Sequence, residues 1–323
     1  MTTRRHLDHG QRRRHRLRNL LQSVLLLGGM VGLLSLCVWV VFGTEGMLWT
    51  FGGWVAALLL SPRASPALVL RLYRGRQLRP RDFPQGFAIL EPLIRRAELN
   101  HVPSFWYLPS PILNAFTLGR RDSAAVAVTD GMIRALNARE FAGVLAHELS
   151  HIRNNDIWVM SLADSIGRLT NLMTLAGALL MIVNLPLLLT GRVQFSWLLI
   201  FLLLLAPTVA NVLQMGLSRA REYDADLEAA MLTGDPAGLA SALRKLEMQQ
   251  AGLWERILMP GRRLPEPSLL RSHPPTQERI RRLMSLYPSK DIVRFDDAGP
   301  FGLGDRPAAD SRPPRWRITG LWH

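Results

Sequence analysis

Two histidines and a glutamate with the spacing HExxH are the residues of this sequence best arranged for chemistry. They are His147, Glu148 and His151. Residues four apart lie on one face of an α-helix, so both imidazoles can point at a single ion. Zinc suits such a pair because it accepts neutral imidazole nitrogen and keeps an open position for water. Glu148 is well placed to take a proton from an attacking water, so the pattern predicts metal-assisted hydrolysis.

A hydrolytic zinc site needs a third protein ligand, and Glu222 is the best candidate in the sequence. Its carboxylate would complete a His₂Glu ligand set. Glu222 follows a long apolar segment that can return it to the side of a membrane that holds the HExxH helix. Asp226 stands one helical turn further on and could accept a proton from a ligand histidine, which would fix the tautomer of that ring.

Both parts of this prediction have simpler alternatives. HExxH can be a chance match on an ordinary amphipathic helix. The acidic residues around Glu222 can belong to a solvated helix with Arg–Glu pairs.

The sequence also predicts the elements that position the HExxH residues. Asn137 can cap the free backbone N–H groups at the start of the helix while Glu140 reaches back to it, as in a capping box. Asn-Asn-Asp at 154–156 predicts the end of this helix. Further upstream, periodicity and turn residues predict one helix and two strands, over residues 87–98, 104–108 and 124–129.

Long apolar segments indicate that the chain crosses a membrane. Residues 20–42, 169–190 and 195–216 carry no charge and are long enough to span a hydrocarbon core of roughly 30 Å at about 1.5 Å per residue. Residues 47–60 could alone form a buried helix or a re-entrant segment, but the short link 43–46 favours a return crossing. The sequence therefore predicts four transmembrane helices in two hairpins. The first segment is too long for a signal peptide, and no clear small-x-small cleavage site follows it.

The distribution of basic residues predicts the orientation. All but one of the 39 Lys and Arg residues lie on the same face if all four segments cross. Because basic loops stay in the cytoplasm, both termini and the HExxH helix are expected there.

The net charge of +14 also raises the possibility of a nucleic-acid function. The basic residues are instead spread through membrane-flanking segments without a nucleic-acid module, so we expect attraction to the lipid bilayer and no nucleic-acid binding. Cys37 is the single cysteine, which excludes an intrachain disulfide and a thiolate zinc cluster.

Five short motifs occur together and in order in this sequence. They are NAF at 114–116, AAVAVT at 124–129, AHELSH at 146–151, REYDAD at 221–226 and HPPTQERI at 273–280. As a set they resemble the HtpX-like membrane metalloproteases, which are relatives of the CAAX prenyl endopeptidases. The resemblance covers roughly residues 20–285, and the Arg-rich arm and Pro-rich tail outside it depart from the family pattern.

The resemblance implies one Zn²⁺ per chain, bound by His147, His151 and Glu222, with Glu148 as the catalytic glutamate. It also implies an enzyme of the bacterial inner membrane that cleaves membrane or misfolded proteins in quality control. One alternative is a prenyl-protein endopeptidase, but the four-span count favours the HtpX-like group. Another is a non-catalytic membrane adaptor with structural zinc, against which the intact Glu148 argues. The sequence leaves the oligomeric state open, a homo-oligomer included.

Weaker expectations concern substrate contacts. In the family that the motifs resemble, His273 and Arg279 lie near the site, where they could stabilise developing oxyanion charge, although His273 could simply start a helix. Asn114 could bind the substrate backbone or merely make a turn. The strand 124–129 could be a sheet edge to which an extended substrate pairs, or an ordinary interior strand.

The expected architecture is a mostly α membrane protein with four transmembrane helices and a cytoplasmic α+β, zincin-like metalloprotease domain that contains a small β-sheet. Each transmembrane hairpin precedes a cytoplasmic protease segment, between a basic arm and a flexible tail rich in Pro and Arg. The basic arm covers residues 1–19 and the first hairpin residues 20–61. The first protease segment covers residues 62–156, the second hairpin residues 157–216 and the second protease segment residues 217–287. The tail covers residues 288–323.

Overall fold

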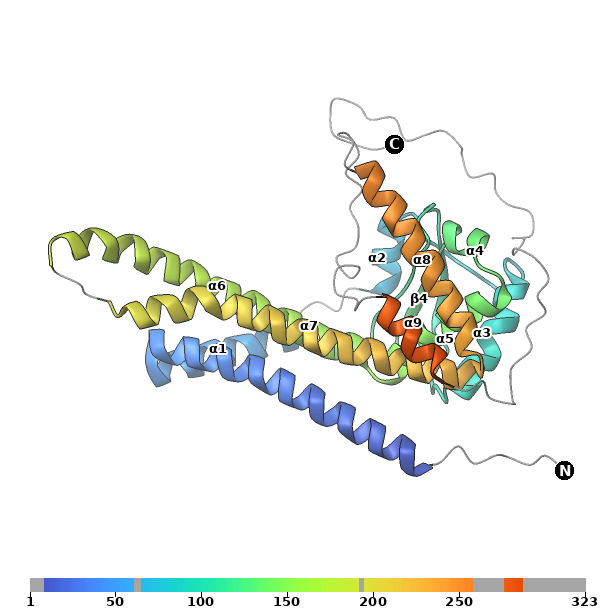
Figure 1. Ribbon diagram of the computed structural model, residues 1–323, viewed down its shortest axis with the longest axis horizontal. Helices are drawn as coiled ribbons and strands as arrows, with labels where there is room; N and C mark the ends of the chain where they lie inside the picture. The colour runs from blue at the N-terminus through green and yellow to red at the C-terminus, as the bar shows by residue number, and fades with distance from the viewer. Residues whose placement is uncertain (1–8, 61–64, 192–194, 258–275, 287–323) are drawn as a thin grey trace.

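A computed structural model describes residues 9–60, 65–191, 195–257 and 276–286. Long helices extend from one side of an α+β domain (Figure 1). The helices are α1 (His9–Leu60), α2 (Pro66–Leu72), α3 (Pro84–Arg96), α4 (Asp130–Ala135), α5 (Ala138–Arg153), α6 (Asp156–Leu189), α7 (Trp197–Thr233), α8 (Pro236–Ile257) and α9 (Thr276–Met284). The strands are β1 (Arg76–Gln77), β2 (Ser104–Leu108), β3 (Ala115–Leu118) and β4 (Ala125–Thr129).

Three of the described helices are long and apolar enough to cross a membrane. They are α1 over residues 20–56, α6 and α7. Many of their leucine and valine side chains are exposed in the isolated chain, as in Leu189 and Leu198, which suits contact with lipid. The chain is therefore a membrane protein with a mostly helical fold.

The first apolar helix changes direction at Gly43. The backbone there has φ 67° and ψ −164°, a conformation that glycine adopts far more readily than other residues. Leu34 and Trp54 would lie about 30 Å apart on a straight helix. Both instead pack into one cluster with Ala163 and Ile166 of α6, so the two arms of α1 lie side by side (Figure 1).

Several predicted boundaries differ from the structure. The sequence predicts a link over residues 43–46, but Gly43 is the only residue within α1 whose backbone is non-helical. The basic arm over residues 1–19 is not separate from the first apolar helix, because α1 begins at His9. The boundary between residues 216 and 217 falls inside α7, because no helix-breaking signal separates its apolar part from its charged part. The tail 288–323 lies outside the described residues.

The β-sheet has the strand order β1-β2-β4-β3. β4 pairs with β2 in parallel, Ser104 opposite Ala125, and with β3 in antiparallel, Thr117 opposite Val126. All five residues of β4 are buried. The possibility that strand 124–129 forms a sheet edge is therefore wrong. It is an interior strand, because β2 pairs with one side of β4 and β3 pairs with the other. The edges of the described sheet are β1 and β3.

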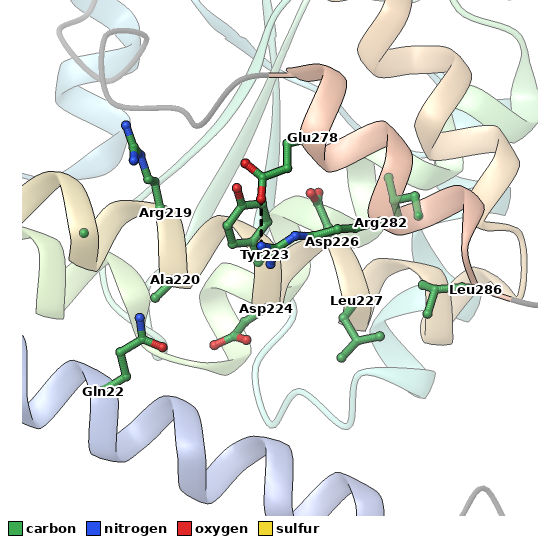
Figure 2. Close-up of a pocket in the computed structure, with 12 residues that line it drawn as sticks. Gln22, Arg219, Ala220, Tyr223, Asp224, Asp226, Leu227, Glu278, Arg282 and Leu286 are labelled. Atoms are coloured by element: carbon green, nitrogen blue, oxygen red, sulfur yellow. Dashed lines mark hydrogen bonds and ion pairs between the residues drawn. The ribbon is translucent and has the colours of Figure 1, made fainter.

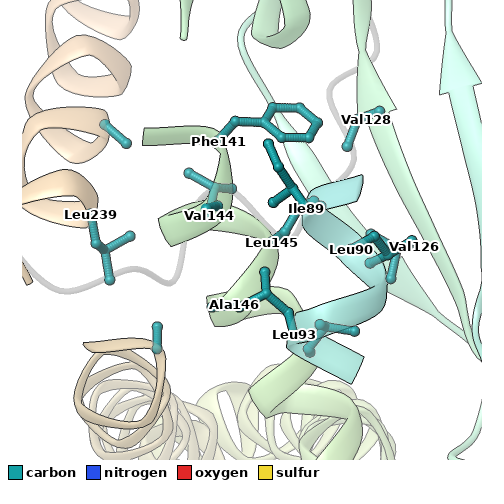
Figure 3. Close-up of a cluster of buried hydrophobic side chains, with 14 of the residues drawn as sticks. Ile89, Leu90, Leu93, Val126, Val128, Phe141, Val144, Leu145, Ala146 and Leu239 are labelled. Atoms are coloured by element: carbon teal, nitrogen blue, oxygen red, sulfur yellow. The ribbon is translucent and has the colours of Figure 1, made fainter. Parts of the chain in front are cut away.

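The core of the domain lies between this sheet and the helices α3, α5 and α8. Phe141 and Leu145 of α5 pack in one buried cluster with Leu90 of α3 and Val126 of β4 (Figure 3). Each fully buried side chain of this size contributes about 1.5–3 kcal/mol. On the other side of α5, α8 approaches so closely that a Cβ on Gly143 would lie 2.9 Å from backbone atoms of Leu239. The HExxH helix is thus fixed from both sides.

Candidate metal centre

The HExxH helix, α5, begins with a complete capping box. The side chain of Asn137 accepts a hydrogen bond from the Glu140 N–H at 2.9 Å, and Oε2 of Glu140 accepts one from the Asn137 N–H at 2.9 Å. Glu140 also accepts hydrogen bonds from Ser241 and Lys245 of α8. The cap that the sequence predicts therefore also ties α5 to its neighbour.

Three potential ligand atoms converge from α5 and α7. Nε2 of His147 lies 3.2 Å from Nε2 of His151 and 3.5 Å from Oε2 of Glu222. Nε2 of His151 lies 3.8 Å from Oε1 of Glu222. Donors held tetrahedrally at about 2.0–2.1 Å from one ion would lie about 3.4 Å apart. The two imidazoles and the carboxylate therefore fit a zinc ion in both type and spacing.

Each of the two imidazoles has a carboxylate behind it. Nδ1 of His147 lies 3.1 Å from Oδ1 of Asp226, and Nδ1 of His151 lies 2.8 Å from Oδ2 of Asp156. A carboxylate at Nδ1 fixes the ring orientation and directs Nε2 toward a metal. All four side chains are at most 16% exposed, so these interactions are largely shielded from water.

Each carboxylate in turn contacts an arginine. Arg279 of α9 donates to both carboxylate oxygens of Asp226 at 2.7 Å, and its third nitrogen lies 3.0 Å from Oε2 of Glu222. Nη1 of Arg221 lies 2.9 Å from Oδ1 of Asp156. The pair of Arg279 with Asp226 is bidentate and charge-assisted, and pairs of this kind are strong and fix geometry. The two arginines therefore hold the carboxylates that hold the imidazoles.

Glu148 lies beside this cluster and contacts the edge strand β3. Oε2 of Glu148 accepts a hydrogen bond of 2.9 Å from Oγ1 of Thr117. Only 9% of Glu148 and 7% of Thr117 is exposed. The carboxylate is thus buried and held by Thr117, on the helix that also carries the two imidazoles, as suits a proton acceptor for an attacking water.

The protonation of the imidazoles reflects these partners. Burial lowers the pKa of His147, but hydrogen bonds with Asp226 and Glu222 outweigh burial and raise the pKa to about 10. Burial also lowers the pKa of His151, and the hydrogen bond with Asp156 again outweighs it, so that the pKa is raised. A metal ion that binds these rings must displace their protons, which makes metal affinity depend on pH.

Comparison with known proteins identifies the family. The description of the matching family is Peptidase family M48, and the match covers residues 80–286. The chain belongs to peptidase family M48. It is a membrane metalloprotease of the HtpX-like kind, as the five motifs indicate, and its hydrolase class follows from the family.

Curated relatives of this M48 peptidase match over most of their length. The protease HtpX homolog of Methylibium petroleiphilum is 31% identical over 293 residues, which cover 84% of this chain and 99% of the relative. The homolog of Acaryochloris marina is 35% identical, with 82% and 91% covered. The homolog of Salinibacter ruber is 34% identical, with 82% and 97% covered. Among solved structures, S. mikatae Ste24p has a TM-score of 0.46 and 20% identity, and covers 84% of this chain and 66% of its own.

The structure of this M48 peptidase brings most of the predicted site residues together. His147, His151 and Glu222 converge, Asp226 contacts His147, and Glu148 follows His147 on α5. Arg279 adjoins the cluster, and its guanidinium contacts the carboxylates of Asp226 and Glu222. Asn114 precedes β3, where its backbone pairs with Thr129. His273 lies outside the described residues.

Three residues of this M48 centre are absent from the sequence prediction. Asp156 is read there only as the end of the HExxH helix, whereas it begins α6 after a left-handed residue, Asn155, with φ 58°. Arg221 stands beside Glu222 in the REYDAD motif but is given no role of its own there. Thr117 carries no local signal at all, because its contact with Glu148 exists only once β3 packs on α5.

Proposed function

We propose that this chain is a zinc endopeptidase of the bacterial inner membrane that cleaves membrane or misfolded proteins on the cytoplasmic side. The observation that carries the proposal is the convergence of His147, His151 and Glu222 beside an oriented Glu148. A structural zinc site needs no carboxylate of this kind next to its ligands, so the geometry supports hydrolysis over the adaptor alternative.

The side chains divide the chemistry among them. His147, His151 and Glu222 would hold zinc, which when bound supplies polarisation of the scissile carbonyl and acidification of a water molecule. Glu148 takes a proton from the attacking water and passes it to the leaving amine. The hydrogen bond from Thr117 keeps the accepting carboxylate in place during both transfers. Asp226 and Asp156 keep the two imidazoles in the tautomer that leaves Nε2 available.

The sheet edge next to Glu148 supports a preference for extended substrates. β3 pairs with β4 on one side and has no strand on its other side among the described residues. A substrate segment that pairs with β3 would run past Glu148, because Thr117 of β3 contacts that carboxylate. Such pairing requires a locally unfolded chain, which suits a role in quality control.

The arrangement of the long helices supports four crossings with a cytoplasmic site. The two arms of α1, together with α6 and α7, would make two hairpins. α6 begins with Asp156 and α7 carries Glu222, so the ends of both helices that reach the metal centre belong to the same face. All but one of the 39 basic residues lie on that face in a four-span arrangement, which by the positive-inside rule is the cytoplasmic one.

The decisive experiment compares the purified protein with its Glu148→Gln variant in native membranes. We expect the parent to release peptides from membrane proteins and the variant to release none, while both contain about one zinc per chain by elemental analysis. Glu91→Gln, an exposed residue of α3, is the matched control. Full proteolysis by Glu148→Gln would refute the role of this carboxylate.

Two further comparisons define the substrate class. Faster cleavage of a destabilised membrane protein than of its folded parent would support quality control, and equal rates would count against it. Cleavage confined to prenylated C-terminal peptides would instead establish the prenyl-protein endopeptidase.

A further inference from the structure

Helix α2 has apolar side chains on two opposite faces. Leu70 is fully buried, and together with Ala67 it packs in one cluster with Trp106 of β2. Leu68 and Leu72 lie one turn apart on the other face and are 59% and 77% exposed. The first face attaches α2 to the sheet, and the second presents two leucines outward.

Exposed apolar side chains are few in the α+β domain. Outside α1, α6 and α7, six large apolar side chains of the described residues are exposed. Three of these six lie together, at Leu68, Leu72 and Tyr73, and Tyr73 is the C-cap of α2. Large apolar side chains that gather on a surface mark a contact with another protein or with a membrane.

The charges around this face are all positive. Between Glu45 and Asp82 the sequence has six arginines and no acidic residue. Arg71 and Arg74 are exposed, and neither forms an ion pair in the part of the chain that the structure describes. An anionic lipid surface attracts arginine and also accepts leucine, so it fits both features of this face.

The uncharged parts of α1 and α7 end at the same level. Gln22, in the first turn of the uncharged part of α1, and Arg219, the first charged residue after that of α7, line one pocket (Figure 2). Glu222, less than one turn further along α7, already belongs to the metal centre. With α1 and α7 across a membrane, as proposed above, the lipid headgroups adjoin the α+β domain at this level.

The position of α2 matches this level. α2 stands on the side of the domain from which the long helices extend (Figure 1). Only five residues separate it from Leu60, the last residue of α1. Such a connection spans at most about 22 Å when fully extended. The chain therefore passes from the second arm of α1 to α2 within a short distance of the headgroups.

α2 also contacts the strand edge next to Glu148. Gly119, which directly follows β3, has φ 92°, and a Cβ there would lie 2.7 Å from Cγ of Pro66 at the start of α2. Phe116 and Leu118 of β3 pack against the same cluster as the buried face of α2. The position of α2 is therefore coupled to that of β3.

We propose that α2 is a membrane-surface anchor whose exposed face contacts anionic phospholipids in the leaflet next to the α+β domain. Leu68 and Leu72 lie at the boundary between headgroups and acyl chains, and Arg71 and Arg74 form charge-assisted hydrogen bonds with lipid phosphates. Through its contact with β3, α2 holds the sheet edge beside Glu148 close to the membrane surface. This inference rests on the proposed crossings of α1 and α7, and it does not depend on proteolysis.

The test uses the full-length protein in lipid bilayers, with Cys37→Ala and one new cysteine that carries a fluorophore. Iodide quenches a label in water, and phospholipid brominated on its acyl chains quenches a label in contact with lipid. At Leu72→Cys we expect quenching by brominated lipid and protection from iodide. At Glu91→Cys, an exposed position of α3, we expect the reverse. Leu179→Cys, an exposed position of α6, reports the crossing itself and should be quenched by lipid.

The class of lipid follows from two brominated lipids with equal acyl chains, phosphatidylglycerol and phosphatidylcholine. Phosphatidylglycerol should quench the label at Leu72 at about fivefold lower mole fraction, the factor that one arginine near an anionic surface provides. Arg71→Gln combined with Arg74→Gln should remove this preference. Arg95→Gln, which changes an exposed arginine of α3, should leave it intact.

The outcomes separate the anchor from the crossings. Lipid quenching at Leu179 but not at Leu72 would overturn the anchor and leave the crossings in place. Absence of lipid quenching at both positions would overturn the crossings and the anchor with them. A label at Leu72 that is protected from both quenchers would show that protein rather than lipid covers α2, which also overturns the proposal. Equal quenching by the two lipids would refute the contacts of the arginines.

Discussion

Nδ1 of His151 lies 2.8 Å from Oδ2 of Asp156, which is the first residue of the next helix. The same relationship exists between His147 and Asp226, but those residues come from helices far apart in the chain. The turn at Asn155, with φ 58°, is what brings Asp156 back toward the metal centre. Asn tolerates this left-handed conformation better than most residues.

Replacement of Asp156 by Asn should weaken zinc binding by about 10–100-fold, because His151 loses the carboxylate that orients it. Competition with a chromophoric chelator measures this affinity. Asp164→Asn removes an exposed carboxylate two turns further along α6 and is the matched control. Equal zinc affinity of the Asp156 and Asp164 variants would show that the contact with His151 does not position the ring.

Replacement of Glu222 by Ala should remove zinc from the protein, since two imidazoles alone leave the ion with an incomplete ligand set. Elemental analysis after a wash with chelator should give well under one zinc per chain, against about one for the parent. Glu91→Ala, which changes an exposed residue of α3, should keep its metal. A Glu222→Ala protein with full zinc content would mean that another residue is the third ligand.

Replacement of Thr117 by Val should lower kcat with little change in KM, because the hydroxyl orients Glu148 without binding substrate. A hydrogen bond to a charged acceptor contributes about 1.5 kcal/mol or more, which corresponds to roughly a tenfold loss in rate. Thr117→Ser, which keeps the hydroxyl, should recover most of the activity. Thr170→Val changes a buried threonine of α6 that bonds only within its own helix, and should have no effect on kcat.

Zinc affinity should rise with pH by about tenfold per unit between pH 6.5 and pH 10 for each proton displaced. The pKa of His147 in the folded, metal-free protein is raised to about 10, above the ordinary value of 6.5. Protonated His147 therefore stabilises the metal-free fold fully below pH 6.5, and this contribution is lost as pH rises through 10. Zinc binding at pH 7.5 should release at least one proton, which titration calorimetry in buffers of different ionisation heat detects. Zinc binding without proton release would contradict the contact of His147 with Asp226 and Glu222.

Local patterns in the sequence were sufficient for the helix that carries the chemistry. Asn137 and Glu140 predict its capped start, and the structure contains that capping box. The strand at 104–108 is present with the predicted bounds, and the strand at 124–129 lacks only Ala124. These features are set by interactions between residues close in the chain, which is why spacing alone reveals them.

The strand order and the partners of the ligands could not be predicted in the same way. β3 rather than β4 forms the sheet edge next to Glu148, because strand order depends on which surfaces the helices cover and not on the strand sequence itself. Asp156 reaches His151 only through the turn at Asn155, and Arg279 reaches Asp226 only because α9 packs on α7.

The sequence by itself therefore determined the reactive residues, their helix and the apolar segments, since each depends on periodicity within a few turns. Only the tertiary structure decided which carboxylate stands behind each imidazole and which strand faces Glu148. Those relationships join residues distant in the chain, and packing of whole elements against one another fixes them.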